Sequence, residues 1–208
     1  MGLRRTTTMF LALLILGLSA LIAPSASQSC YGDITSLQTP VISCGPVKTV
    51  GCGVSASEKI AEIDIIHLRS YRTIIRRVAK SLCLEPSLIA AIISVGSRVG
   101  HLLENGWDHQ RVRFGLMQID RRYYPIRGTW NSEEHIIQGS TILTIALKTV
   151  RKTYPRWTWA QQLRGALCAY HSRDWKIQVY DGRDYCSGGN DYVNNVIIRA
   201  KYFKRIGF

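Results

Sequence analysis

The sequence has no internal repeat, no low-complexity run and no linker-like segment. Its 208 residues suffice for one domain with a hydrophobic core. Residues 10–22 are almost purely apolar, and no second stretch approaches the about 20 residues that a membrane-spanning helix needs. We therefore expect a single soluble domain and no membrane span.

The apolar stretch has the flanks of a secretory leader. Arg4 and Arg5 precede it, and the small residues Pro-Ser-Ala-Ser follow it at positions 24–27. This order is typical of a cleaved signal peptide. A membrane anchor is the alternative, but the apolar run is short for a span. We predict a signal peptide over residues 1–27 and a secreted, extracellular domain over residues 28–208.

Motifs for metal or nucleic-acid binding are also missing. No C-x-x-C occurs and the five histidines do not cluster at ligand spacing, so neither a metal nor another cofactor is expected. No base-reading motif is present, so nucleic acid is not an expected partner. An even number of cysteines after a leader indicates disulfides, although the sequence alone cannot choose their pairing. The six cysteines are Cys30, Cys44, Cys52, Cys83, Cys168 and Cys186.

Acidic residues are scarce, with 14 Asp and Glu against 27 Lys and Arg. Removal of the leader would lower the formal charge from +13 to +11, because only Arg4 and Arg5 are lost with it. Such a surface favours anionic partners, including bacterial envelopes, sulphated glycans and acidic lipids. The simpler alternative is that this charge only keeps the protein soluble.

Apolar residues recur at three- and four-residue steps over several segments, which indicates a mostly helical domain. Residues 28–54 lack this period and predict an irregular N-terminal arm held by disulfides. The capping-box spacing of Ser55 and Glu58 predicts the start of a short helix. A second, amphipathic helix with a solvated basic face is expected to end near Cys83.

The following helix is expected to begin at Glu85-Pro86, because proline suits the first turn, and to stop around Gly96 to Gly100. It is apolar almost all round, which predicts a central, buried helix. The remaining patterns predict a strand over residues 114–119, a helix from about Glu133, a helix over residues 160–170, a polar loop over residues 171–190 and a last helix. We predict an α+β fold that is predominantly α-helical, with one small β element.

Six motifs occur in order along the chain: CYGDI (30–34), SASEKIAE (55–62), LIAAIIS (88–94), NGW (105–107), FGLMQID (114–120) and RAKYFK (199–204). In this order they resemble the goose-type (G-type) lysozyme family, and within it the vertebrate lysozyme g-like proteins. The resemblance covers essentially all of residues 28–208. It implies a lysozyme-like fold with a small β-sheet beside the cleft, and hydrolysis of the β-1,4 bond between N-acetylmuramic acid and N-acetylglucosamine in peptidoglycan. It also implies disulfides Cys30–Cys83 and Cys44–Cys52, which leaves Cys168 with Cys186.

Cleavage of a glycosidic bond needs a protonated carboxylic acid and a second carboxylate that activates water or stabilises the transition state. Goose-type lysozymes carry the acid in I-S-R-E-S-H-x-G after the central helix. The same stretch reads I-S-V-G-S-R-V-G here, and the position of the general acid is Gly96. Glu104 lies eight residues farther on, beyond the expected helix end, so it cannot simply replace the missing acid.

The resemblance leaves two other carboxylates as catalytic candidates. Asp120 closes the family's G-L-M-Q-x-D motif and is the candidate second carboxylate, although it also suits a strand-end residue that caps a turn. Asp108 lies one position before the usual aspartate of the family, and that usual position is His109. Histidine titrates near neutrality and could substitute for an acid, or it could be a plain surface residue.

Two aromatic residues are candidates for stacking on sugar rings. They are Trp107 and Tyr170, which could equally be packing residues. The family's glycine-rich loop A-Y-N-A-G-A-G-N-V is replaced here by A-Y-H-S-R-D-W-K-I at residues 169–177. This departure weakens the expected sugar contacts further.

Three functions follow from these observations. We favour a monomeric lysozyme-like protein that has lost catalysis, a pseudoenzyme that binds peptidoglycan or a related glycan, because general acid catalysis contributes typically about 10²–10⁴-fold. The first alternative is a weakly active antibacterial muramidase that uses Asp120 with a substitute acid. The second is a cationic secreted protein that acts on anionic envelopes through charge alone.

Overall fold

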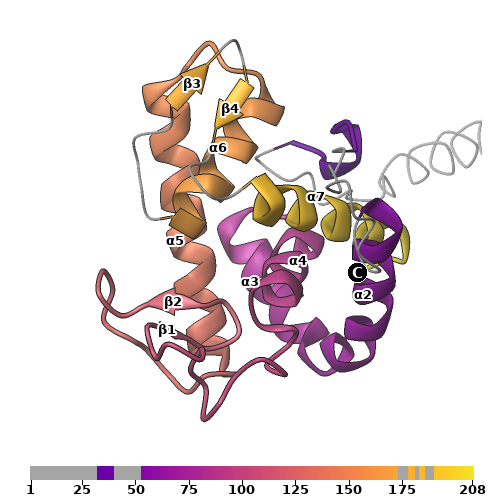
Figure 1. Cartoon of the computed structure of the whole chain (residues 1–208), viewed down its shortest axis with the longest axis vertical. Coiled ribbons are helices and arrows are strands. Elements are labelled where there is room, and N and C mark those ends of the chain that lie inside the picture. The colour runs from indigo at the N-terminus through magenta and orange to yellow at the C-terminus, as the bar shows by residue number, and fades with distance from the viewer. Residues whose placement is uncertain (1–31, 40–52, 173–177, 181–182, 186–189) are drawn as a thin grey trace, which may run out of the picture.

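The computed structural model describes residues 32–39, 53–172, 178–180, 183–185 and 190–208. The described chain is mostly helical with two small antiparallel hairpins, which confirms the predicted α+β class (Figure 1). The elements are η1 (Ile34–Ser36), α2 (Val54–Leu68), η2 (Arg69–Tyr71), α3 (Arg72–Leu82), α4 (Pro86–Ser97), β1 (Arg113–Phe114), β2 (Ile119–Asp120), α5 (Glu133–Thr153), α6 (Trp159–Ser172), β3 (Gln178–Tyr180), β4 (Arg183–Tyr185) and α7 (Asn190–Arg205).

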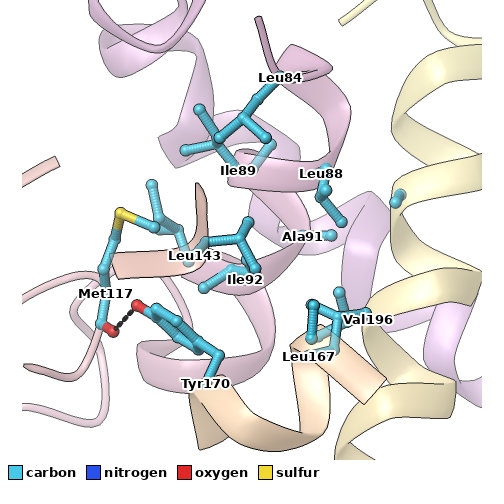
Figure 2. Packing of buried hydrophobic residues seen from close by; sticks show 14 of the residues in the cluster. Leu84, Leu88, Ile89, Ala91, Ile92, Met117, Leu143, Leu167, Tyr170 and Val196 are labelled. Atoms are coloured by element: carbon cyan, nitrogen blue, oxygen red, sulfur yellow. Dashed lines mark hydrogen bonds between the residues drawn. The ribbon is translucent and has the colours of Figure 1, made fainter. Parts of the chain in front are cut away.

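Helix α4 is the centre of the domain, as its apolar sequence predicts. Pro86 occupies its first turn, and Arg98 ends it in the left-handed conformation. Nearly all its side chains are buried, and its most extensive packing partner is α7 (Figure 1). Around it the core gathers side chains from α5, α6 and α7, including Leu143, Leu167 and Val196 (Figure 2). The central helix is therefore held from several sides, and its C-terminal end has a defined position.

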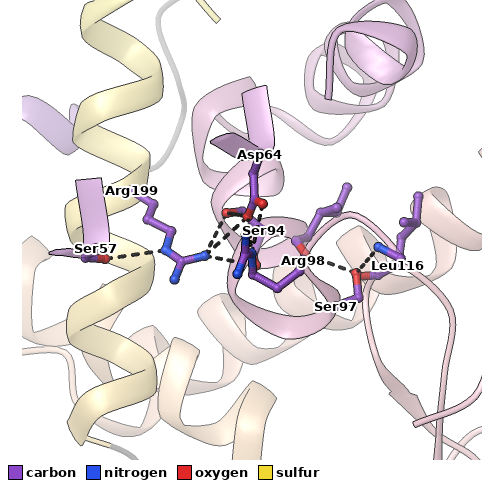
Figure 3. A network of polar contacts seen from close by, with 9 residues as sticks. Ser57, Asp64, Ser94, Ser97, Arg98, Leu116 and Arg199 are labelled. Atoms are coloured by element: carbon purple, nitrogen blue, oxygen red, sulfur yellow. Dashed lines mark hydrogen bonds and ion pairs between the residues drawn. The ribbon is translucent and has the colours of Figure 1, made fainter. Parts of the chain in front are cut away.

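A buried polar network joins α2, α4 and α7 inside this core (Figure 3). Asp64 of α2 is fully buried and accepts from Ser94 Oγ at 2.7 Å and Arg98 Nε at 2.8 Å. Arg199 of α7 lies 3.5 Å from the same carboxylate and donates to Ser94 Oγ at 2.8 Å. Burial lowers the pKa of Arg199 to about 10, although Asp64 opposes the shift. Since a buried charge is costly unless it is paired, this carboxylate fixes two arginines beside α4.

The predicted strand over residues 114–119 is wrong in its detail. The chain instead forms a hairpin, in which Phe114 pairs with Ile119 and Arg113 with Asp120. Between the two strands, Gly115 has a φ of 72° and a side chain there would collide with the ring of His135. The apolar run therefore turns against α5 because its backbone packs closely there, a tertiary contact that strand periodicity does not reveal.

The prediction of a capping box and a short helix after the N-terminal arm is also wrong. Helix α2 spans 15 residues, so it is not short, and Gly53 occupies its N-cap position without a side-chain cap. Glu58 pairs with Arg205 of α7 at 2.6 Å and makes no capping box. A long-range ion pair has replaced the local hydrogen bond from Glu58 to the backbone that the spacing suggests.

The other helix boundaries agree with the sequence patterns. Helix α3 ends at Leu82 with Cys83 at its C-cap, and α5 begins at Glu133. The predicted polar loop over residues 171–190 is wrong in part, because α6 extends to Ser172 and the short hairpin β3–β4 follows it. Strands of three residues are too short to show a clear alternation of apolar and polar residues, so the sequence did not predict this hairpin.

Several predictions fall outside the described residues. These include the signal peptide over residues 1–27 and most of the irregular arm over residues 28–54, of which η1 is one described piece. Only Cys83 and Cys168 among the six cysteines are described, so the disulfide pairing stays a prediction. Within the described ranges, no helix is both long enough and apolar enough to cross a membrane.

Candidate functional site

A small cavity lies at the C-terminal end of α4, where the β1–β2 hairpin, the end of α6 and the start of α7 meet. Its volume is about 90 Å³. Among the described residues that line it none is acidic, and Arg113 supplies a guanidinium. The lining residues are Val95, Gly96, Arg113, Gln118, Tyr170, His171 and Tyr192.

Gly96 forms part of the wall, at the position where the resemblance expects a general acid. It lies within the last turn of α4, which ends at Ser97, inside the range that the sequence predicts for the helix end. A Cβ atom built on Gly96 would lie 3.2 Å from Cγ of Gln118, another lining residue. A side chain at this position would therefore point toward the cavity, and it would need only a small shift of the flexible Gln118.

Arg113 and His171 form the polar side of the cavity. The guanidinium donates to the carbonyl oxygen of His171 at 2.9 Å and lies 3.3 Å from its Nδ1. Arginine only donates, so Nδ1 must be the acceptor and the proton of a neutral His171 lies on Nε2. The imidazole also stacks on Tyr192, with ring centroids 4.0 Å apart and an interplanar angle of 14°. The arrangement fixes a cation in the lining of the same cavity as Gly96.

Asp120 does not line this cavity and is fully buried. Its carboxylate accepts from the backbone N of Arg122 at 2.9 Å and from Nε and Nη2 of that residue at 3.0 and 2.6 Å. The hydrogen bond to Asp120 is the main cause that raises the pKa of Arg122. The geometry matches the structural alternative for Asp120, a strand-end residue that caps a turn.

The other loop candidates make local contacts. Asp108 accepts from the backbone N of Val112 at 2.7 Å and of Arg113 at 3.0 Å, which holds the loop before β1. His109 is exposed. Neither residue lines the cavity.

Trp107 and Tyr170 differ in their surroundings. Trp107 is half-buried against Phe114, with ring centroids 4.7 Å apart. Arg121 covers its ring, with the guanidinium carbon 5.2 Å from the centroid. Tyr170 lines the cavity but is only 2% exposed, and its hydroxyl donates to the carbonyl oxygen of Met117 at 2.7 Å (Figure 2). Tyr170 therefore serves packing, and Trp107 keeps a partly accessible ring.

The sequence patterns missed His135, which organises the turn between β1 and β2. This α5 residue is fully buried, and its Nε2 accepts from the backbone N of Met117 at 3.1 Å. Burial lowers its pKa to about 4. The accepted bond places its proton on Nδ1, which has no partner among the described residues. A single histidine beside apolar Ile136 was the signal available in the sequence.

Arg113 was missed as well, because one arginine in a basic sequence carries no signal of its own. His171 was noticed only as part of the altered loop. No three His, Cys, Asp or Glu side chains in the described part of the chain gather in a way that could hold a metal ion.

Comparisons with known proteins agree with this architecture. A family model described as Lysozyme g matches residues 31–207. The chain is 43% identical over 204 residues to lysozyme g of Gallus gallus, covering 96% of this chain and 97% of the relative. It is 42% identical over 204 residues to lysozyme g of Struthio camelus, covering 96% of this chain and all of the relative. It is 40% identical over 185 residues to lysozyme g-like protein 2 of Homo sapiens, covering 89% and 85%. The protein therefore belongs to the goose-type lysozyme family, lysozyme g.

Proposed function

We propose that this protein is a secreted, non-catalytic member of the lysozyme g family that binds peptidoglycan or a related glycan. The observation that carries the proposal is Gly96, which brings no carboxyl group to the cavity at the end of α4. Glycosidases of this kind need a general acid that an apolar pocket keeps protonated. Loss of that acid alone removes typically about 10²–10⁴-fold of rate.

The surroundings of the cavity support this loss. Arg113 is the charged group of the lining, and a cation favours the ionised form of any carboxyl group that enters. The candidate second carboxylate, Asp120, is buried and paired with Arg122. The first feature disfavours the protonated acid that the leaving oxygen needs, and the second commits the carboxylate to Arg122 instead of to a water molecule.

A role in binding rests on what remains of the scaffold. The central helix, the β1–β2 hairpin and the half-buried Trp107 are retained, so a glycan could still contact this face. Secretion rests on the leader-like residues 1–27, and the excess of basic residues would favour anionic cell walls.

The test compares cleavage and binding by the purified domain of residues 28–208. We expect no loss of turbidity and no soluble muropeptides from bacterial peptidoglycan, with an active goose-type lysozyme as positive control. We also expect the protein to cosediment with peptidoglycan and to bind neutral chitin-type oligosaccharides independently of salt. Robust muropeptide release would instead establish the muramidase alternative. Binding to heparin and peptidoglycan that disappears with rising salt, without binding to neutral oligosaccharides, would establish the cationic alternative.

A further inference from the structure

We propose that the cavity beside Gly96 is a binding site for a carboxylate group of an acidic glycan, with Arg113 as its cationic partner. The inference rests on the proposed function, because it names the chemistry that the altered cleft would recognise. Where an active enzyme would carry its own acid, this chain offers a space and a positive charge to the acid of a ligand.

Among the described residues, the charge of Arg113 has no acidic partner. Its guanidinium contacts His171 through a carbonyl oxygen and a ring nitrogen, and it forms no ion pair within the described residues. The acid nearest in sequence, Asp108, accepts from the backbone N of Arg113 and forms no ion pair with its side chain. A guanidinium has five N–H donors and suits the planar, bidentate geometry of carboxylates. Donors therefore remain for a ligand after the contacts with His171.

The size of the cavity suits such a group. Its volume of about 90 Å³ exceeds the about 10–15 Å³ that a single water requires, so a small carboxylate fits. Arg113 is half-buried, and partial removal from water strengthens its attraction for an anion. The stacked rings of His171 and Tyr192 form the adjoining wall, and no acidic side chain among the described lining residues would repel a ligand.

The first experiment titrates the domain with acetate at neutral pH and constant ionic strength, and follows amide and arginine side-chain signals by NMR. We expect saturable shifts at Gly96 and at the guanidinium of Arg113, with a dissociation constant on the order of millimolar. Arg113→Gln should weaken binding at least about tenfold, since it removes the cation. Arg127→Gln is the matched control, because Arg127 is exposed and does not line the cavity.

Gly96→Glu supplies a second, independent variant. Its carboxylate should occupy the cavity and abolish acetate binding, which keeps the inference testable if Arg113→Gln does not fold. Acetate that shifts no signal at the cavity in the unmodified domain would overturn the inference. Equal weakening by Arg127→Gln would also overturn it, because the effect would then be one of net charge.

The second experiment compares a neutral N-acetylglucosamine oligosaccharide with one of equal length that contains N-acetylmuramic acid, whose lactyl group bears a carboxylate. Arg113→Gln should lower affinity for the acidic sugar about tenfold and leave the neutral sugar unchanged. Binding of both sugars with no effect of Arg113→Gln would reject the carboxylate site and leave glycan binding intact. Acetate binding without binding of either sugar would support the site and reject the proposed glycan function.

Discussion

The carboxylate of Asp120 is fully buried and accepts two hydrogen bonds from the guanidinium of Arg122, at 3.0 and 2.6 Å. The pair closes the turn after β2, since Asp120 also accepts from the backbone N of Arg122. The register places Arg113 opposite Asp120 in the hairpin, yet the acid pairs with Arg122. The side chain of Arg113 instead lines the cavity at the end of α4.

The first prediction concerns the structural role of Asp120. We expect Asp120→Asn to lower the free energy of unfolding by about 1–3 kcal/mol, because it weakens hydrogen bonds to a buried charged group. Urea unfolding followed by circular dichroism measures the change. Glu104→Gln, at an exposed acid of the preceding loop, should change stability by less than about 0.5 kcal/mol. Unchanged stability of Asp120→Asn together with loss of glycan binding would point to a functional role instead.

The second prediction concerns the restoration of an acid at position 96. Gly96→Glu should give only slight muropeptide release, because Arg113 lines the same cavity and would lower the pKa of the new carboxyl group. Each unit of this shift lowers the protonated fraction near neutral pH about tenfold. Gly96→Glu combined with Arg113→Gln should therefore release more, and the comparison is a muropeptide assay by chromatography.

A third arm tests the second carboxylate in that background. If Asp120 takes part in catalysis, adding Asp120→Asn to Gly96→Glu and Arg113→Gln should abolish the gain. Equal activity of the single and double variants would contradict the inhibitory role of Arg113. Inactivity of every variant would mean that the altered residues 169–177 have removed substrate positioning as well.

The third prediction is an acid sensitivity caused by His135. Its pKa is about 4 in the folded protein and 6.5 ordinarily, so the unfolded chain binds the proton more tightly. The stability that neutral His135 contributes is therefore fully present above pH 6.5. It is lost as the pH falls from 6.5 to 4, by roughly 3 kcal/mol in total. Unfolding in urea at a series of pH values measures this loss.

His135→Gln is the matched variant, because an amide oxygen can still accept from the backbone N of Met117 without titrating. It should show a shallower decline of stability between pH 6.5 and 4 than the unmodified protein. An identical decline in both proteins would assign the acid sensitivity to other groups.

The fourth prediction compares a buried ion pair with a surface one. Asp64→Ala should cost about 3–5 kcal/mol, because it leaves the buried Arg199 without its carboxylate. Glu133→Gln removes the partner of Arg77, whose side chain is 63% exposed, and should cost less than about 1 kcal/mol. Chemical denaturation of both variants measures the two losses in free energy of unfolding. Equal losses would show that burial does not strengthen the contribution of the Asp64 network in Figure 3.

The sequence by itself determined the helical architecture from α3 onward to a large extent. Apolar periodicity located α3, α5 and α7, and an almost uninterrupted apolar run identified α4 as the buried centre. These patterns are local in the sequence and show which face of a helix packs on the core, so they can be recognised without knowledge of the fold. The motif around Gly96 likewise sufficed to show a glycine where the family pattern that it resembles has a glutamate.

The tertiary structure alone decided the character of the site. It paired Glu58 with Arg205 in place of a capping box, and buried Asp120 against Arg122. It also brought Arg113 of the hairpin to His171 at the end of α6, 58 residues away. Ion pairs and hydrogen bonds between distant segments depend on which surfaces meet in the fold, and residue spacing in the sequence does not show which surfaces those are. For this reason the sequence could show that position 96 carries no acid, whereas the arginine that lines the same cavity emerged only from the packing of α4, α6 and the hairpin.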